Sequence, residues 1–236
     1  MSVVLEARAL RKNYLGGDGS LIEVLRGLEL SVSTGEFVAV TGESGSGKST
    51  LLHLVGALDR PTSGQVLLDG TAYEGLDVDA LAALRNRKIG FVFQFHHLLR
   101  DFTALENVAM PLLIAGHPPA AARERARILL DSVGLGGRLS HLPAQLSGGE
   151  QQRAAVARAL ATEPMLLLAD EPSGNLDERN AEQLHLLFAG LAREFRTAVI
   201  VVTHNRALAS GADRVLTLSE GILAPESDSR AELVSR

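Results

Sequence analysis

The stretch Gly42-Glu43-Ser44-Gly45-Ser46-Gly47-Lys48-Ser49-Thr50 decides the fold, because it fits the phosphate-binding pattern G-x-x-x-x-G-K-[ST]. A strand-like apolar run precedes it at residues 36–41, and a helix-like run follows at residues 48–58. The glycines allow several backbone N–H groups to face one anion, and the helix adds the positive end of its dipole. Lys48 is suited to the β- and γ-phosphates, and the Ser49 hydroxyl is placed for Mg²⁺. We therefore predict that residues 42–50 bind a nucleoside triphosphate; the alternative is a glycine-rich turn with an exposed lysine.

Composition limits the possible function classes. The 236 residues are 46% hydrophobic, enough for one large α/β domain or for a core with a small insert. With 23 basic and 28 acidic residues the net charge is −5, which gives no general attraction to nucleic acid or anionic lipid. The absence of cysteine excludes disulfides, thiolate metal sites and cysteine nucleophiles. No signal-like amino terminus and no apolar run of about 20 residues is present, so we expect any membrane role to come through a partner.

Short apolar runs alternate with helical patterns, which is typical of the α/β class with a mainly parallel sheet. The expected strands are residues 36–41, 89–93, 165–169, 198–202 and 215–218. The expected helices are residues 48–58, 79–87, 119–133, 149–161 and 178–194. Residues 3–10 and 23–32 alternate in polarity around a glycine-rich turn, so we expect an antiparallel β layer there. The nearly uncharged residues 108–122 predict a short helix that ends in a proline turn.

An insert interrupts the nucleotide-binding core. About 120 residues separate Lys48 from Asp170, far more than one crossover connection needs. Residues 94–158 are mostly helical by pattern and are broken by glycines at residues 134–137. We therefore predict a single domain whose core comprises residues 1–93 and 159–225, with an inserted helical subdomain at residues 94–158. A polar tail follows at residues 226–236.

A second constellation is an apolar strand that ends in two carboxylates, Asp170 and Glu171. The carboxyl edge of a parallel sheet is where open α/β folds bind ligands. In a P-loop protein such an aspartate holds Mg²⁺, and the glutamate is a possible general base for the attacking water. An acidic turn after a buried strand is the alternative, and the presence of Lys48 in the same chain argues against it.

A third constellation, the signature segment, spans residues 146–153 and contains Ser147, Gly148 and Gly149 at the start of an alanine-rich helix. Two glycines behind a serine form a second anion-binding helix start. One nucleotide cannot readily bind two separate phosphate-binding helix starts of the same chain. We therefore predict a head-to-tail dimer in which the signature segment of one chain covers ATP held by the other. The alternative is an ordinary serine N-cap.

Together, residues 42–49, 146–153 and 166–171 resemble the Walker A, signature and Walker B motifs of ABC-type ATPase subunits. The similarity extends over approximately residues 3–223. The resemblance implies a RecA-like P-loop NTPase fold with a mixed sheet, an antiparallel β layer and an inserted helical subdomain. It also implies that ATP and Mg²⁺ are bound, and that the catalytic residues are Lys48, Gln94, Glu171 and His204.

The same resemblance gives roles to four single residues. Gln94 would contact Mg²⁺ and link the core to the helical subdomain, and His204 would contact the γ-phosphate. Tyr14 is placed like the aromatic residue that stacks on adenine. Residues 173–177 resemble the D-loop, in which Asp177 would help shape the opposite site of the dimer. Taken singly, each of these residues has a plainer interpretation as a surface turn residue or a packing residue.

The segment around Gln94 narrows the resemblance. Residues 90–108 are similar to the ATP-binding subunits of lipoprotein-releasing ABC transporters of Gram-negative bacteria. The same broader group includes ATPases of macrolide or toxin exporters and of cell division. This similarity implies ATP-driven release of lipoproteins from the inner membrane toward the outer membrane. It implies a homodimer bound to two transmembrane permease subunits at the cytoplasmic face. Residues 94–108 would contact these subunits; the alternative is packing within the helical subdomain.

Two other classes share the nucleotide motifs. An ABC ATPase of DNA repair or chromosome structure would need a coiled-coil or zinc-bearing insertion, and the chain has neither heptads nor cysteine. A regulatory module that closes on ATP without rapid turnover stays open at this point. Its separation from a transport ATPase requires assays with membrane partners.

Overall fold

A six-stranded sheet lies at the centre of the fold, in the order β10-β9-β3-β8-β7-β6. The computed structural model describes residues 2–226, so the predicted tail lies outside the described residues beyond residue 226. The parallel strands are β3 (Phe37–Thr41), β6 (Ile89–Phe93), β7 (Leu166–Asp170), β8 (Ala198–Val202) and β9 (Arg214–Ser219). At one edge β10 (Ile222–Pro225) pairs antiparallel with β9, so the sheet is mixed. The central strands are buried on both faces, which explains their unbroken apolar runs.

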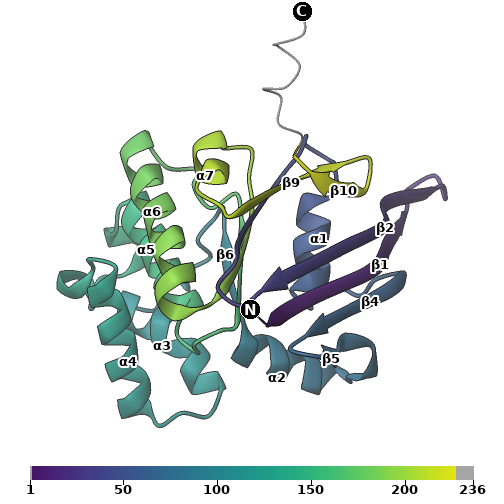
Figure 1. Cartoon of the computed structure of the whole chain (residues 1–236). Coiled ribbons are helices and arrows are strands. Elements are labelled where there is room, and N and C mark those ends of the chain that lie inside the picture. Colours follow the sequence, from purple (N-terminus) through teal and green to yellow (C-terminus); the bar gives the residue numbers. More distant parts are fainter. Residues whose placement is uncertain (1, 227–236) are drawn as a thin grey trace, which may run out of the picture.

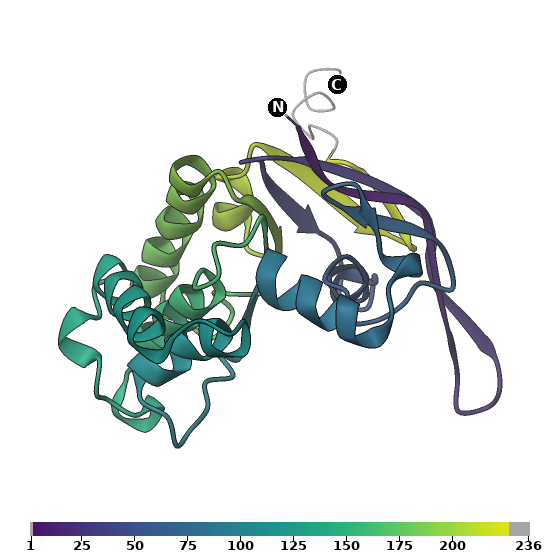
Figure 2. The same cartoon turned by 90° about the horizontal axis from the view of Figure 1, so that it is seen from below.

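The amino-terminal residues form a second, four-stranded sheet in the order β2-β1-β4-β5. Its long hairpin joins β1 (Val3–Leu15) to β2 (Leu21–Ser33), which confirms the predicted antiparallel layer. The shorter strands β4 (Ser63–Leu68) and β5 (Thr71–Ala72) continue this sheet and were not predicted. Figure 2 shows the closed end of the β1–β2 hairpin projecting from the rest of the molecule.

The α-helices within residues 2–226 gather on two sides of the central sheet (Figure 1). On the side of the β1–β2 hairpin are α1 (Lys48–Val55) and α2 (Val78–Lys88). On the other side are α3 (Ala104–Ile114), α4 (Pro119–Ser132), α5 (Gly148–Ala159), α6 (Glu178–Phe195) and α7 (Arg206–Ser210). Short 3₁₀ turns are η1 (Tyr73–Gly75), η2 (Gly136–Arg138) and η3 (Pro143–Gln145).

The predicted short helix at residues 108–122 is the second half of α3, which ends at Ile114 before α4 begins at Pro119. The earlier start of α3 has a local cause. Thr103 Oγ1 accepts a hydrogen bond from the Glu106 backbone N–H at 3.2 Å, and the Glu106 carboxylate accepts one from the Thr103 N–H at 2.8 Å. This reciprocal capping box fixes the first turn at Ala104.

Buried apolar side chains form one cluster on each face of the central sheet. On one face Leu167 and Val199 pack with residues of α3, α4 and α5. On the other face Leu168 and Ile200 pack with α1 and the β1–β2–β4 layer. The helices of the predicted insert thus share a cluster with one face of the sheet, and the subdomain boundaries themselves stay a prediction. Within residues 2–226 no helix has both the length and the apolar character that a bilayer crossing requires.

Candidate active site

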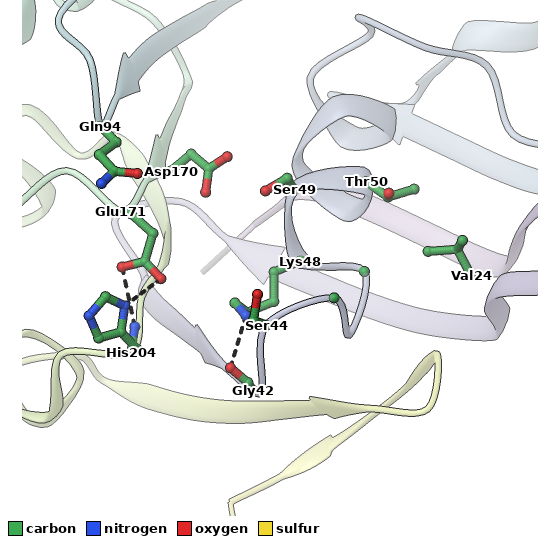
Figure 3. Close-up of a pocket in the computed structure, with 12 residues that line it drawn as sticks. Val24, Gly42, Ser44, Lys48, Ser49, Thr50, Gln94, Asp170, Glu171 and His204 are labelled. Carbon is green, nitrogen blue, oxygen red and sulfur yellow. Dashed lines mark hydrogen bonds and ion pairs between the residues drawn. The ribbon is translucent and has the colours of Figure 1, made fainter. Parts of the chain in front are cut away.

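A cavity of about 620 Å³ opens beside the carboxyl ends of β3, β6, β7 and β8. Two walls face each other across it in Figure 3. One wall is the loop after β3 with the start of α1, and contributes Gly42, Ser44, Gly45, Gly47, Lys48, Ser49 and Thr50. The other wall contributes Gln94, Asp170, Glu171 and His204. The structure therefore brings the first and second predicted constellations to one cavity, at the sheet edge where α/β folds bind ligands.

The phosphate loop, residues 42–50, has a backbone that requires glycine at particular positions. Gly42 has a φ of +147°, and a Cβ atom there would lie 2.9 Å from Ser46 Oγ and would also clash with the Leu218 carbonyl oxygen. Gly47 has a φ of +102° and is the N-cap of α1, where it provides no side-chain hydrogen bond. The first N–H groups of α1 are therefore left without a side-chain cap at the cavity wall.

Two donors of the phosphate loop show what ligand it fits. Lys48 Nζ donates hydrogen bonds to the carbonyl oxygens of Gly42 at 2.8 Å and of Glu43 at 2.7 Å, and within residues 2–226 no carboxylate forms an ion pair with it. Ser46 Oγ is buried and has no hydrogen-bond partner within residues 2–226. Phosphate oxygens are strong acceptors for both an ammonium and a hydroxyl. The donor set of the loop therefore fits the phosphates of a nucleotide.

Asp170 ends β7 and faces Ser49 across the cavity (Figure 3). Burial raises the pKa of the Asp170 carboxyl above its ordinary value, and a hydrogen bond from Ser49 opposes this rise. Within residues 2–226 no cluster of three or more histidine or acidic side chains could hold a metal by itself. One carboxylate and one hydroxyl suit Mg²⁺, which keeps several waters and takes further ligands from substrate phosphates. The residues present therefore fit a magnesium ion bound together with a nucleotide.

Glu171 and His204, which were predicted separately, form a hydrogen-bonded pair. The Glu171 carboxylate accepts from His204 Nδ1 at 2.9 Å and from the His204 backbone N–H at 3.3 Å. Glu171 has a φ of +43°, a left-handed conformation that is strained for a residue with a side chain. Its own N–H donates to the Val202 carbonyl at 2.9 Å, which anchors this backbone to β8. The two hydrogen bonds from His204 thus hold the Glu171 carboxylate at the cavity wall, where the side chain is 18% exposed.

Gln94 follows β6 and is paired with a residue of the D-loop. Its Nε2 donates to Asn175 Oδ1 at 3.3 Å, and Asn175 Nδ2 donates back to the Gln94 carbonyl at 3.2 Å. Sequence reasoning gave no separate role to Asn175, and it did not identify Val24, which lines the cavity from β2. Val24 lies in an ordinary strand pattern, so no sequence signal distinguishes it from a packing residue.

Other predicted ligand-binding residues lie outside the lining of this cavity. The Tyr14 hydroxyl donates to Asp59 at 3.2 Å, and Lys12 Nζ lies 4.9 Å from the centre of the Tyr14 ring. Asp177 caps α6, where its carboxylate accepts from the Asn180 backbone N–H at 2.8 Å. The adenine contact of Tyr14 and the cross-dimer contact of Asp177 stay predictions.

The signature segment also lies outside the cavity, and side chains of its own chain cap the helix that it begins. Ser147 is the N-cap of α5 and forms a capping box with Glu150, whose carboxylate accepts from the Ser147 N–H at 2.8 Å. Arg138 Nε donates to the same carboxylate at 3.0 Å. The backbone hydrogen bond from Ser147 and the bond from Arg138 lower the pKa of Glu150 to about 2. The binding roles of Ser147, Gly148 and Gly149 stay predictions, since within one chain they do not reach the phosphate loop's cavity.

Comparison with known proteins adds family and structural relatives. A family model described as ABC transporter matches residues 25–174. The lipoprotein-releasing system ATP-binding protein LolD 2 of Chlorobaculum tepidum is 54% identical over 226 residues, covering 94% of this chain and 92% of the relative. LolD of Alcanivorax borkumensis is 53% identical over 93% of this chain and 96% of its own length. The ATP-binding cassette MJ0796, solved as a dimer bound to ADP and Pi, superposes with a TM-score of 0.86 at 39% identity, covering 94% of this chain and 98% of that chain.

Proposed function

This chain belongs to the ABC transporter family, and we propose that it is the ATP-binding and ATP-hydrolysing subunit of a transporter that releases lipoproteins from the inner membrane toward the outer membrane. The observation that carries the ATPase assignment is the single cavity in which Lys48 and Ser49 face Asp170 and Glu171. The lipoprotein assignment follows from the relatives that bear this function in their names.

The phosphate loop binds the nucleotide. Lys48 exchanges its two backbone carbonyl partners for β- and γ-phosphate oxygens, and the uncapped start of α1 donates N–H groups to the same phosphates. Ser49, Gln94 and Asp170 would hold Mg²⁺. When bound, this ion neutralises the charge that develops on the phosphate oxygens.

Glu171 acts on the attacking water. Its carboxylate orients the water and accepts its proton as the oxygen attacks the γ-phosphorus, while the bond to the leaving ADP oxygen breaks. The backbone N–H and the imidazole of His204 hold this carboxylate in place, which is the contact seen in the structure. His204 would also contact the γ-phosphate and stabilise its charge. The strained φ of Glu171 preorganises the base before ATP arrives.

The site is completed by a second copy of the chain. In the proposed head-to-tail dimer, Ser147, Gly148 and Gly149 of one chain cover the nucleotide held by the other, and Asp177 reaches the opposite site. Support comes from the position of the signature segment, which lies outside its own chain's cavity. Tyr14 would stack on adenine at the outer end of the site.

Two permease subunits would dock on the face formed by α3 and β6 and hold the chain at the cytoplasmic face of the inner membrane. A groove of about 450 Å³ lies there, with mostly apolar lining that includes Phe91, Phe93, Pro111 and Ile114. Phe95, two residues after Phe93 in the chain, is 64% exposed. An exposed aromatic side chain in the segment that follows an apolar groove is a suitable anchor for a membrane partner.

Reconstitution tests the transport assignment. The chain is combined in proteoliposomes with the candidate membrane subunits and a lipoprotein, and phosphate release and lipoprotein release are measured together. We expect ATP-dependent release and a rise in ATPase activity, both absent with Lys48→Ala. Stimulation by a macrolide-exporter permease or a peptidoglycan-control partner, with no lipoprotein release, would instead assign the chain to an exporter or to cell division.

A further inference from the structure

The starts of α5 and α6 contact each other through one side chain, Asn180. Gly149, in the first turn of α5, is buried, and a Cβ atom there would lie 2.6 Å from Asn180 Cγ and would clash with Asn180 Oδ1. The side-chain amide of Asn180 thus occupies the space that any larger residue at position 149 would need. This glycine therefore has a packing requirement within one chain, separate from any contact with a ligand.

The same amide is held by the D-loop. Asn180 Nδ2 donates to both carboxylate oxygens of Asp177, at 2.8 and 3.0 Å. Arg153 of α5 donates a hydrogen bond from Nη1 to the amide oxygen, Asn180 Oδ1, at 3.5 Å. Hydrogen bonds from the Asn180 backbone and side chain lower the pKa of Asp177, so the carboxylate is the acceptor that the amide needs. Asn180 therefore touches the signature helix with its oxygen and the D-loop with its nitrogen.

We propose that Asn180 is a positioning residue that fixes the signature glycine Gly149 and the D-loop carboxylate Asp177 as one rigid unit. The inference rests on the composite dimer site of the proposed function. In that site both elements meet the nucleotide held by the partner chain, so a fixed distance between them lets one closing motion place both. Rigid attachment lowers the entropy cost of ordering each element separately.

A helix cap alone does not account for this arrangement. The Asp177 carboxylate already caps α6 through the Asn180 backbone N–H, and this bond would survive replacement of the Asn180 side chain. The Asn180 side-chain amide adds a contact with Gly149 and Arg153 of α5, which the helix cap does not need. The contact joins two helices that the strand β7 separates in the chain, so no local sequence interaction produces it.

A stability cycle tests the contact itself in the nucleotide-free chain. Gly149→Ala should lower the urea midpoint of unfolding, because the new methyl group displaces the amide. In an Asn180→Ala background the same substitution should be neutral or raise the midpoint, since alanine is a better helix former than glycine. Additive shifts in the two backgrounds would show that Asn180 does not confine Gly149, and would overturn the proposal.

A second measurement tests positioning. In a Glu171→Gln background, which should accumulate the ATP-closed dimer, adding Asn180→Ala should raise the ATP concentration for half-maximal dimerisation by about tenfold, equivalent to losing one coupled contact. ADP affinity of the monomer should be unchanged, which a general loss of folding would not produce. Gln183→Ala, exposed on the same helix, is the matched control and should match the Glu171→Gln parent.

The outcomes separate the two proposals. If the Glu171→Gln parent stays monomeric with ATP, the composite site fails and the role of Asn180 in closure fails with it. If the parent dimerises and Asn180→Ala leaves its ATP midpoint unchanged, only the role of Asn180 is overturned. A weakened dimer with unchanged ADP affinity supports both.

Discussion

The starts of α1 and α5 were both predicted to bind phosphate, and the structure gives them opposite local chemistry. The first begins after Gly47, and in the part of the chain that the structure describes it has no side-chain cap and the neighbouring Ser46 hydroxyl has no hydrogen-bond partner. The second begins after Ser147 with a complete capping box, in which Glu150 is also bonded to Arg138. The α1 end therefore carries donors that need an acceptor, whereas the α5 end is already stabilised by its own chain.

This difference separates binding of the nucleotide from closure over it. An uncapped helix start in a cavity gains most of its hydrogen bonds from the ligand. A capped start keeps its geometry without the ligand and can serve as a preformed surface for a nucleotide held elsewhere. Damage to the α1 end should therefore weaken nucleotide binding by the monomer, and damage to the α5 end should spare this binding but weaken the dimer.

The largest expected effect comes from removing the base while leaving both helix starts intact. Glu171→Gln should lower ATP turnover by about 10²–10⁴-fold, because glutamine cannot accept the proton of the attacking water. Nucleotide binding should be retained and a closed dimer should accumulate with ATP, as measured by phosphate release and size-exclusion chromatography. Glu220→Gln, in an exposed turn, is the control. Rapid turnover by Glu171→Gln would show that Glu171 is not the base.

The next effect concerns the α1 end alone. Lys48→Ala removes a charged donor to two phosphates, and at about 1.5–3 kcal/mol for a hydrogen bond to a charged group the loss is roughly 10- to 150-fold in ATP affinity. Calorimetric titration of the monomer with MgATP measures it. Lys88→Ala, which removes only a surface ion pair with Asp69, should bind ATP like the parent. Equal affinity of Lys48→Ala and the parent would contradict the role of the phosphate loop.

The strands and the phosphate loop could largely be predicted from the sequence, because the residues that determine them are close together in the chain. The strand β7 was predicted from an unbroken apolar run, and the phosphate loop from glycines whose positive φ is a backbone requirement. The predicted helix at residues 48–58 ends earlier, at Val55, where Gly56 is its C-cap, a stop signal that the sequence itself contains. Packing adds a second requirement for this glycine, since a Cβ atom at position 56 would lie 2.6 Å from the Phe91 ring, and this contact 35 positions away leaves no local signal.

The contacts within the site were less predictable for the same reason. Glu171 and His204 were identified separately, but their hydrogen bond depends on the turn after β7 meeting the end of β8. Asn175 and Asn180 had no motif role of their own, and each contacts a distant element, Asn175 at Gln94 and Asn180 at Gly149. Sequence patterns thus predicted several groups that line the cavity, and missed groups that form hydrogen bonds or packing contacts with them.

A smaller effect tests the α5 end. Ser147→Ala removes the N-cap hydroxyl and should cost about 1 kcal/mol of stability, measured by urea unfolding. Thr103→Ala removes the equivalent hydroxyl from the capping box of α3 and is a matched control with a similar stability loss. Only Ser147→Ala should weaken ATP-driven dimerisation, and neither should change ADP binding to the monomer. If the two variants dimerise equally well, the signature segment does not cover the partner's nucleotide.

The smallest effect is a pH dependence confined to the α5 end. The pKa of Glu150 falls from an ordinary 4.5 to about 2 in the folded chain, so its ionised carboxylate stabilises the fold fully above about pH 4.5 and this contribution is lost as the pH falls toward 2. Glu150→Gln should therefore be less stable than the parent near pH 7, and the difference should shrink by about pH 3. Glu106→Gln, in the capping box of α3, should show a smaller difference, because Arg123 acts on Glu106 only as a nearby charge, whereas Arg138 also donates a hydrogen bond to Glu150. An equal pH response from both variants would show that Arg138 does not stabilise the start of α5. The preformed geometry of that helix start would then come from the serine cap alone.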